Sequence, residues 1–302
     1  MTDVHFQLTD DQRALRTGVR QLLEGRFGRE ALRAAVDGAE RQGAPALDRE
    51  LWRELGEAGF FALRLPEEAG GVGLGLPEAV LAFEEAGRVL LPGPLVTTEL
   101  AAATVPGAAA GTTVVTCADG PLVSWIDAAD VALGSTAGAR AVRSVDPLTP
   151  LHRVPAAPGR SAPPQGLRSP AGVLLTAAEQ LGSAARTCEL AVQHARQREQ
   201  FGRPIGSFQA VKHLCAQMLV RTEVARAAVY AAAVTEDPLE ASGARLLADE
   251  AAVRGARDCL QVCGGMGFTW ESDVHLHLKR AWLRTELGPS SADAEEALAS
   301  AL

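Results

Sequence analysis

Lysine is nearly absent from this sequence of 302 residues, and its basic residues form no run. Only Lys212 and Lys279 are lysines, and the formal net charge is -8. A nucleic-acid partner would require a stripe of positive charge to follow the phosphate backbone. We therefore do not expect this chain to bind nucleic acid.

Long apolar runs are lacking as well. No stretch approaches the roughly 20 uninterrupted apolar residues of a membrane span. The opening MTDVHFQLTDDQ does not have the charged and then apolar pattern of a secretion signal. These absences predict a cytoplasmic protein with no membrane partner.

Cysteine is scarce, with five in the chain. Cys259 and Cys263 have a spacing that could begin a metal site, but no second pair follows that would complete a zinc site. In a cytoplasmic protein we expect reduced thiols that pack as small apolar side chains. The sequence thus predicts no metal site.

The first hundred or so residues have the apolar periodicity of helices. Thr9 and Gln12 have the spacing of a capping box, which marks the start of a helix. Three helices are predicted in this part of the chain: 8–27, 52–58 and 77–88. A glycine-rich turn at 70–75 separates the last two. We assign residues 1–103 to an N-terminal helical domain.

From about Thr112 the sequence changes to short β-branched and apolar runs between Gly, Asp and Pro, which are typical of short strands. The segment 104–168, which ends in a linker rich in Pro and Gly, has room for about six strands at most. After Pro170 the apolar spacing is helical again and indicates an antiparallel bundle over 169–302. The predicted fold is mainly α with a small β insert: an N-terminal helical domain, a short middle β domain and a C-terminal four-helix bundle.

The stretch RQREQFGRPIGSFQAVKH, residues 196–213, ends a helix at Arg198 and then breaks it with glycines and a proline. The Arg198 guanidinium therefore projects at a corner of the chain beside Phe201. A bidentate donor next to an aromatic ring suits a phosphate attached to a ring system. The alternative is a surface arginine and a core phenylalanine.

A second stretch, QVCGGMGFTWESDVHLHLKR from Gln261 to Arg280, follows a helix with the adjacent glycines Gly264 and Gly265. Glycines after a helix usually cap it. Several together also let the backbone approach a ligand closely.

These stretches make the chain similar to the acyl-CoA dehydrogenase family, in which FAD oxidises an acyl-CoA thioester between its α and β carbons. LWRELGEAGFFALRLPEEAGGVGLGLPEAVLAFEEAG resembles the family's N-terminal domain, QREQFGRPIGSFQAVKHLCAQM its first C-terminal signature, and QVCGGMGF its second. The resemblance implies FAD as the cofactor. It also implies that six residues hold the adenosine and pyrophosphate end of a flavin bound mainly by the neighbouring protomer: Arg198, Gln200, Phe201, Gln261, Gly264 and Gly265.

The family's chemistry requires a carboxylate that removes the α proton. By the family's spacing, the two positions that carry this base fall here on Gly172 and Pro289, and neither is an acid. Glu286, three residues before Pro289, could serve only if the alignment shifts; the alternative is a solvated glutamate near a helix end. We predict that this chain has no catalytic residue of its own.

Four other side chains could carry protons in principle. Glu179 lies in GVLLTAAEQLG, where burial would raise its pKa, but its spacing fits neither base position, so we predict a surface or interface glutamate. His213 belongs to the first signature and is predicted to pack or pair. His275 and His277 are predicted to point to one side of an extended or loosely helical segment, without an identified partner.

The middle domain departs from the family. The Thr-Glu-Pro type of stretch that flanks the flavin ring is missing; its nearest counterpart is TCADGPLVSW with Trp125, and the segment is too short for a complete barrel. These losses, with GGMGFTWESDVHLHLKR, resemble the non-catalytic, truncated subunits of heterotetrameric acyl-CoA dehydrogenases of bacterial steroid side-chain degradation.

The resemblance implies a homologous catalytic partner, with two copies of each subunit and a bulky, steroid-derived acyl-CoA in the partner's site. Two alternatives stay open. One is a flavin-free scaffold. The other is a self-sufficient homo-oligomer that uses Glu286 as the base.

Overall fold

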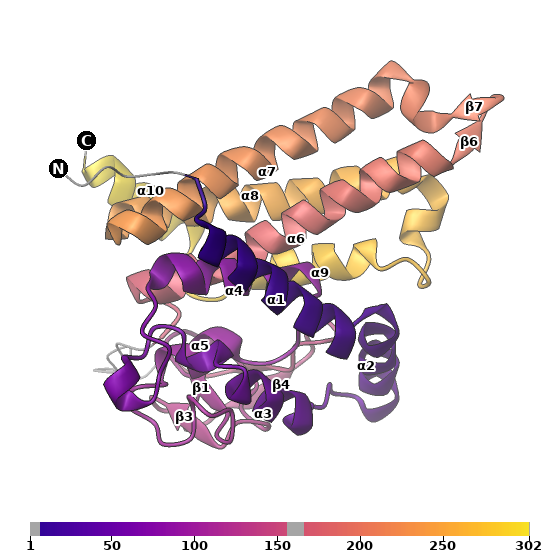
Figure 1. Cartoon of the computed structure of the whole chain (residues 1–302). Coiled ribbons are helices and arrows are strands. Elements are labelled where there is room, and N and C mark those ends of the chain that lie inside the picture. The colour runs from indigo at the N-terminus through magenta and orange to yellow at the C-terminus, as the bar shows by residue number, and fades with distance from the viewer. Residues whose placement is uncertain (1–6, 156–165, 302) are drawn as a thin grey trace.

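The structure, a computed structural model, describes residues 7–155 and 166–301, and places a small β region beside two helical regions (Figure 1). Most of the predicted linker, 156–165, lies outside the described residues. The predicted fold class, mainly α with a small β insert, is confirmed. The domain boundaries at 103 and 168 stay predictions.

The N-terminal region is helical, as predicted. Thr9 and Gln12 form the predicted capping box: the Thr9 hydroxyl oxygen accepts the Gln12 N–H at 3.2 Å, and the Gln12 side chain accepts the Thr9 N–H at 3.0 Å. α2 and α5 were not predicted from the sequence. The helices of this region are α1 (Asp10–Arg26), α2 (Arg29–Gln42), α3 (Arg49–Glu57), η1 (Phe60–Ala62), η2 (Glu67–Ala69), α4 (Leu76–Arg88) and α5 (Leu95–Leu100).

The middle region contains short strands that do not close into a barrel. β1 pairs with β3 in parallel, and β5 lies between β2 and β4 in an antiparallel sheet, with Val123 opposite His152. The strands are β1 (Val115–Cys117), β2 (Leu122–Ser124), β3 (Val131–Leu133), β4 (Arg140–Val142) and β5 (Leu151–Arg153). Each has only three residues, so this region depends on the helices packed against it.

The C-terminal region is a bundle in which α6 and α8 run in one direction and α7 returns between them in the chain (Figure 1). The shorter α9 packs against α6 and α8, and α10 packs against α8. The helices and short strands of this region are α6 (Pro170–Gln197), β6 (Glu199–Gln200), β7 (Arg203–Pro204), η3 (Ile205–Ser207), α7 (Gln209–Thr235), α8 (Pro238–Cys263), η4 (Gly264–Phe268), α9 (Val274–Thr285) and α10 (Ser291–Ser300). Within residues 7–155 and 166–301, no helix has the length and apolarity needed to cross a membrane.

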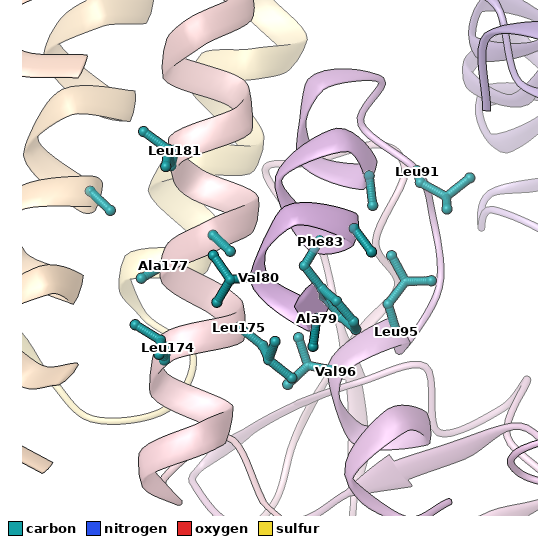
Figure 2. Packing of buried hydrophobic residues seen from close by; sticks show 14 of the residues in the cluster. Ala79, Val80, Phe83, Leu91, Leu95, Val96, Leu174, Leu175, Ala177 and Leu181 are labelled. Carbon is teal, nitrogen blue, oxygen red and sulfur yellow. The ribbon is translucent and has the colours of Figure 1, made fainter. Parts of the chain in front are cut away.

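The core joins the two helical regions through α4 and α6. Figure 2 shows Val80 beside α6 and Phe83 directed toward the segment that carries Leu95, and all three side chains are buried. Burial of each such side chain is worth roughly 1.5–3 kcal/mol. The helices approach closely because Gly182 has no side chain: a Cβ there would overlap the backbone carbonyl oxygen of Glu84. This contact covers one face of α6 and decides which of its side chains are buried.

Candidate functional site

The first signature forms a hairpin that projects from the end of the bundle (Figure 1). Arg198 caps α6, with its backbone N–H donating to the His194 carbonyl oxygen at 2.8 Å. β6 and β7 then pair across Phe201 and Gly202, which have φ of 55° and 75°, as a tight two-residue hairpin requires. Phe201 is 92% exposed. The predicted corner is confirmed, and the alternative of a core phenylalanine is wrong.

The Arg198 guanidinium is free to bind a ligand. Its side chain is exposed, and no residue in the described ranges forms a hydrogen bond or an ion pair with it. His194 nearby has a lowered pKa, mainly because it is partly buried and further because of the Arg198 charge. A guanidinium without a protein carboxylate keeps both N–H donors for a phosphate.

The second signature turns the chain at the end of α8. Gly264 has φ of 60° and ψ of -142°, a conformation that a side chain would strain, and its N–H donates to the Gln261 carbonyl oxygen. Gly265 is different, because its φ is not positive and a Cβ built there meets no described atom within 4 Å. The conformation and packing of the described chain therefore do not require glycine at 265. An approaching ligand or partner would explain it.

The two signatures lie at the same end of the bundle. α6 and α8 run in parallel, so the chain leaves both helices on one side, at the upper right and right of Figure 1. Ala195 and Ile205 from the first segment belong to the same apolar cluster as Leu260 and Cys263 from the second. Of the six predicted cofactor residues only Gly264 is partly covered; the others are exposed. A guanidinium, an aromatic ring and open glycine backbone fit a phosphate with an attached ring.

Two hollows lie elsewhere in the described chain. An apolar groove of about 700 Å³ runs between α6 and α7 and is lined by Cys188 and Cys215, among others. Burial raises the pKa of both thiols, that of Cys188 to about 11, so neither is a reactive thiolate at neutral pH. A second hollow of about 490 Å³ lies between the end of α2, the β4–β5 segment and α9. Neither hollow is lined by any of the six predicted cofactor residues or by the two expected base positions.

Neither expected base position carries a carboxylate, and Gly172 has no room for one. Gly172 lies in the first turn of α6, where its N–H donates to the Ser169 hydroxyl oxygen at 3.1 Å. A Cβ at 172 would overlap the Gly166 carbonyl oxygen and lie 2.9 Å from the Leu167 Cα. No side chain fits there unless the backbone moves. Pro289 lies in the connection between α9 and α10.

Glu286 follows the last turn of α9 and is exposed. It does not line either of the two large hollows or the small interior cavity described below. Its position is that of a solvated glutamate near a helix end, which was the alternative to a catalytic role.

Glu179 is buried, so the prediction of a surface or interface glutamate was wrong. It is 6% exposed because the close contact of α4 covers this face of α6. Its Oε1 lies 2.6 Å from Nη2 of Arg284. Burial raises the pKa of Glu179, although the charges of Arg284, Arg280 and Arg245 oppose this. A carboxylate that is enclosed and paired in this way has no access to a substrate proton.

The space where Trp125 meets α5, α6 and α9 is almost filled. A cavity of about 60 Å³ remains, lined by Trp125, Glu179, Arg280 and Arg284. Arg280 pairs with Asp146 and donates to the Leu91 carbonyl oxygen at 3.2 Å. Ligand pockets usually have about 300–1,000 Å³. This interior space therefore does not admit a flavin ring or an acyl chain.

The buried arginines were missed in the sequence. Arg280 and Arg284 are four residues apart, so they project from the same side of α9. Arg245 of α8 donates to the Arg284 carbonyl oxygen and pairs with Asp249 at 2.8 Å. The four-residue spacing of Arg280 and Arg284 was visible in the sequence. Apolar and polar residues alternate around these arginines, however, so no local pattern indicates that they are buried.

The histidines have structural partners. His213 Nε2 lies 2.9 Å from the side-chain nitrogen of Gln209, so the predicted pairing is confirmed. His275 stacks on Trp270 with ring centroids 4.8 Å apart, and His277 Nδ1 lies 2.8 Å from the Ser183 hydroxyl oxygen. Both lie in the regular helix α9, where residues two apart point in different directions. The predicted loose segment with both histidines on one side was wrong.

The cysteines are free thiols, and Cys259 is fully buried. Among the residues that the structure describes, no group of three or more histidine, cysteine or acidic side chains could hold a metal ion.

Fold and site together define a protein with two helical regions beside a small β region. It has an exposed ring, guanidinium and glycine turn at the free end of its bundle, and a cavity of only about 60 Å³ beside Trp125. Two family models match most of the chain: the N-terminal domain of acyl-CoA dehydrogenases over residues 9–114 and the C-terminal domain over residues 172–291. The chain belongs to the acyl-CoA dehydrogenase family, whose members are FAD-dependent flavoproteins.

Curated relatives and solved structures agree with this assignment. The acyl-CoA dehydrogenase IpdE2 of Mycobacterium tuberculosis is 39% identical over 295 residues, which cover 90% of this chain and 91% of the relative. The ChsE4-ChsE5 complex from Mycobacterium tuberculosis has a similar fold, with a TM-score of 0.81 and 23% identity over 98% of each chain. A variant of the steroid ACAD Tcur3481-Tcur3483 has a TM-score of 0.78 and 24% identity, over 96% of this chain and 97% of that one.

Proposed function

We propose that this chain is the non-catalytic subunit of a heterotetrameric, FAD-dependent acyl-CoA dehydrogenase. In that assembly it lends Arg198, Gln200, Phe201 and the turn 261–265 to the adenosine and pyrophosphate end of FAD. A homologous partner subunit holds the flavin ring, supplies the glutamate base and binds the acyl-CoA. We infer that the acyl group is bulky and steroid-derived, in keeping with a similar fold in the steroid ACAD Tcur3481-Tcur3483.

One contrast within the chain carries this proposal. Five of the six residues for the phosphate end of a flavin are exposed at the end of the bundle, and the Arg198 guanidinium has no partner among the described residues, whereas the interior next to Trp125 keeps a cavity of only about 60 Å³. At Gly172 a carboxylate is sterically excluded, and position 289 is a proline. A self-sufficient enzyme needs both parts of the site, and only the outward-facing part is open here.

The residues of this chain would hold the cofactor away from the reacting bond. FAD, when bound, supplies the acceptor for the hydride that leaves the β carbon of the acyl group. Arg198 would neutralise and orient the pyrophosphate through its paired N–H donors. Phe201 would cover a face of the adenine ring, and Gly265 would let the backbone approach the phosphates. None of these groups moves a proton.

The first experiment compares this chain alone with the chain co-expressed with a glutamate-bearing acyl-CoA dehydrogenase homologue from the same organism. Flavin absorbance and solution mass are measured for both. We expect flavin only in a mixed tetramer. A flavin-loaded homo-oligomer would instead support a self-sufficient enzyme, and a mixed complex without flavin would support a scaffold.

The second experiment uses variants of the mixed complex. Arg198→Ala removes a charge-assisted hydrogen-bond donor worth about 1.5–3 kcal/mol, so FAD affinity should fall at least about tenfold. Gly265→Val adds a side chain where the described chain has open space, so it should leave the stability of the chain unchanged and still lower flavin occupancy. Gly243→Val, also open but within α8, is the control. Equal flavin occupancy in the two valine variants would contradict the assigned role of Gly265.

The substrate class is tested separately. The mixed complex is assayed for oxidation of a steroid side-chain acyl-CoA and of a short straight-chain acyl-CoA. We expect activity with the bulky thioester. A flavin-loaded complex that oxidises only the short one would remove the steroid part of the proposal and leave the divided cofactor site intact.

A further inference from the structure

A polar cavity of about 180 Å³ lies among α1, α2, α4, α6 and α9, away from the proposed cofactor residues. We call it the arginine cavity, because it is lined by Arg20, Arg29, Arg88 and Arg186. Three carboxylates also line it: Glu24, Glu85 and Asp273. The family assignment and the proposed function give this cavity no role.

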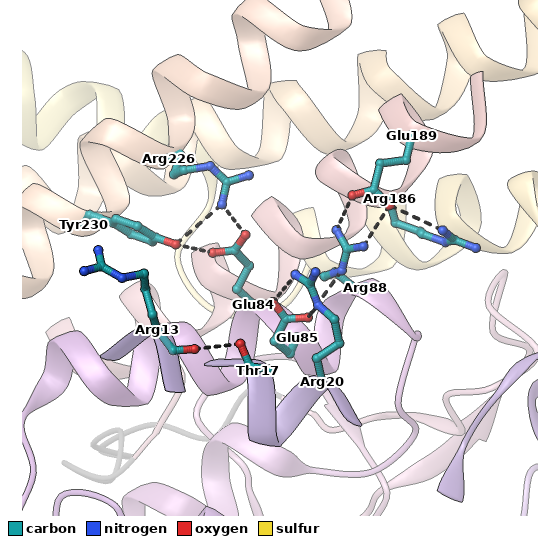
Figure 3. A network of polar contacts seen from close by, with 10 residues as sticks. All are labelled: Arg13, Thr17, Arg20, Glu84, Glu85, Arg88, Arg186, Glu189, Arg226 and Tyr230. Carbon is teal, nitrogen blue, oxygen red and sulfur yellow. Dashed lines mark hydrogen bonds and ion pairs between the residues drawn. The ribbon is translucent and has the colours of Figure 1, made fainter. Parts of the chain in front are cut away.

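Three of these arginines share two carboxylates, and the fourth, Arg29, pairs with Asp273 at 2.6 Å. Figure 3 shows Glu85 held by Arg20 through two bonds of 2.8 and 2.6 Å, with Arg88 at 3.3 Å from the same carboxylate. Arg88 and Arg186 also share Glu189, at 2.8 and 3.3 Å. Three guanidinium groups are thus served by two carboxylates. Some of their N–H donors have room for another acceptor.

The start of α2 adds a second source of positive potential. α2 has 14 residues, and its N-cap residue, Gly28, provides no side chain to accept the first N–H groups. Gly28 and Arg29 both line the arginine cavity. An uncapped helix N-terminus carries unsatisfied N–H groups and a partial positive charge, which favour an anion.

His277 offers a further donor from the opposite wall. It is 3% exposed and lines the cavity. Ser183 is fully buried, and in the described chain His277 Nδ1, at 2.8 Å, is the acceptor available to its hydroxyl. Because a buried hydroxyl donates wherever it can, Nδ1 accepts and the ring hydrogen lies on Nε2. No described residue bonds Nε2. The pKa of His277 is lowered to about 3, mainly by burial and further by Arg186, Arg280, Arg284 and Arg88, so the ring is neutral.

We propose that the arginine cavity binds a phosphate-type oxyanion. The occupant accepts hydrogen bonds from Arg186, from the first N–H groups of α2 and from His277 Nε2–H. Oxygen acceptors suit donors that converge from three directions. The ligand is either free phosphate or the phosphoryl group of a small metabolite. The proposal does not depend on the heterotetramer.

The test is calorimetric titration of the full chain at neutral pH and fixed ionic strength. Inorganic phosphate, glycerol 3-phosphate and chloride are the three ligands. We expect saturable binding of at least one phosphate and none of chloride. Tighter binding of inorganic phosphate would indicate the free ion, and tighter binding of glycerol 3-phosphate would indicate a phosphorylated metabolite. Equal responses to phosphate and chloride would overturn the proposal, because they would report charge screening alone.

Variants locate the site. Arg186→Ala should weaken phosphate binding at least tenfold, since Arg186 is half-exposed and makes one ion pair, with Glu189. Arg254→Ala is the matched control, because Arg254 also makes a single exposed pair, with Glu250 on α8. Arg29→Ala repeats the test if the first variant does not fold. Phosphate should also raise the melting temperature of wild type and the control, but not of Arg186→Ala. Unchanged affinity in both Arg186→Ala and Arg29→Ala would refute the site.

Discussion

The buried pair of Glu179 and Arg284 allows a sharp test of whether the interior of this chain is closed. Both side chains are 7% exposed, and their charged atoms lie 2.6 Å apart. Arg284→Met removes one charge and leaves the Glu179 carboxylate buried without its ion-pair partner. Breaking a buried pair in this way costs about 3–5 kcal/mol, because the remaining charge loses both water and its partner. We therefore expect Arg284→Met to lower the free energy of unfolding by that amount.

The double variant Glu179→Leu with Arg284→Met separates the pair from the packing. Replacing a buried ion pair with apolar residues of similar volume is often neutral or stabilising by about 1–4 kcal/mol. The double variant should thus recover most of the stability that Arg284→Met loses. Urea unfolding of wild type, both single variants and the double variant gives the coupling energy of the pair. A loss below about 1 kcal/mol in Arg284→Met would mean that the pair is solvated, and the argument for a closed interior would fail.

Two other predictions test the packing and the pH dependence. Gly182→Ala should lower the free energy of unfolding by about 1–3 kcal/mol or more, because its Cβ would overlap the Glu84 carbonyl oxygen. Gly243→Ala meets open space within a helix and should raise the free energy of unfolding by up to about 1 kcal/mol. Equal melting temperatures of the two variants in thermal unfolding would contradict this packing. His277 has a folded pKa of about 3, below the ordinary histidine value of 6.5, mainly because it is buried, so its contribution to stability is present above pH 6.5 and is lost as the pH falls. Between pH 7 and pH 5, the free energy of unfolding of wild type should fall by about 2 kcal/mol more than that of His277→Gln, as measured by denaturant unfolding at both pH values. Parallel pH profiles of the two proteins would mean that His277 is not buried in its neutral form.

Much of the fold could be predicted because its signals are local. The capping box at Thr9 and the glycine break after Arg198 each specify a boundary by backbone chemistry that needs no distant partner. α2 was missed although its apolar spacing was present, and its Gly28 cap gave no side-chain signal for the start of a helix. Strands of three residues offered too few positions for an alternating pattern to fix their register.

The candidate site, too, could be predicted from the sequence only in part. Its residue types, and the lack of an acid at the two base positions, were visible in the sequence by resemblance to the family. The exposure of Phe201 was not, because one aromatic residue in a turn packs inward or outward according to what lies beside the hairpin. Glu179 was mispredicted in the opposite direction. Glutamate is usually exposed, but Glu179 is buried because α4 covers it.

The sequence by itself determined the order of the helices, the turns between them and the lack of an acid at positions 172 and 289, since these depend on neighbouring residues. Only the tertiary structure decided that both signatures meet at one end of the bundle, that Arg280 and Arg284 fill the interior, and that arginines from four helices enclose one cavity. Those outcomes depend on which helix faces cover one another. That is set by packing among residues far apart in the chain, which no local pattern records.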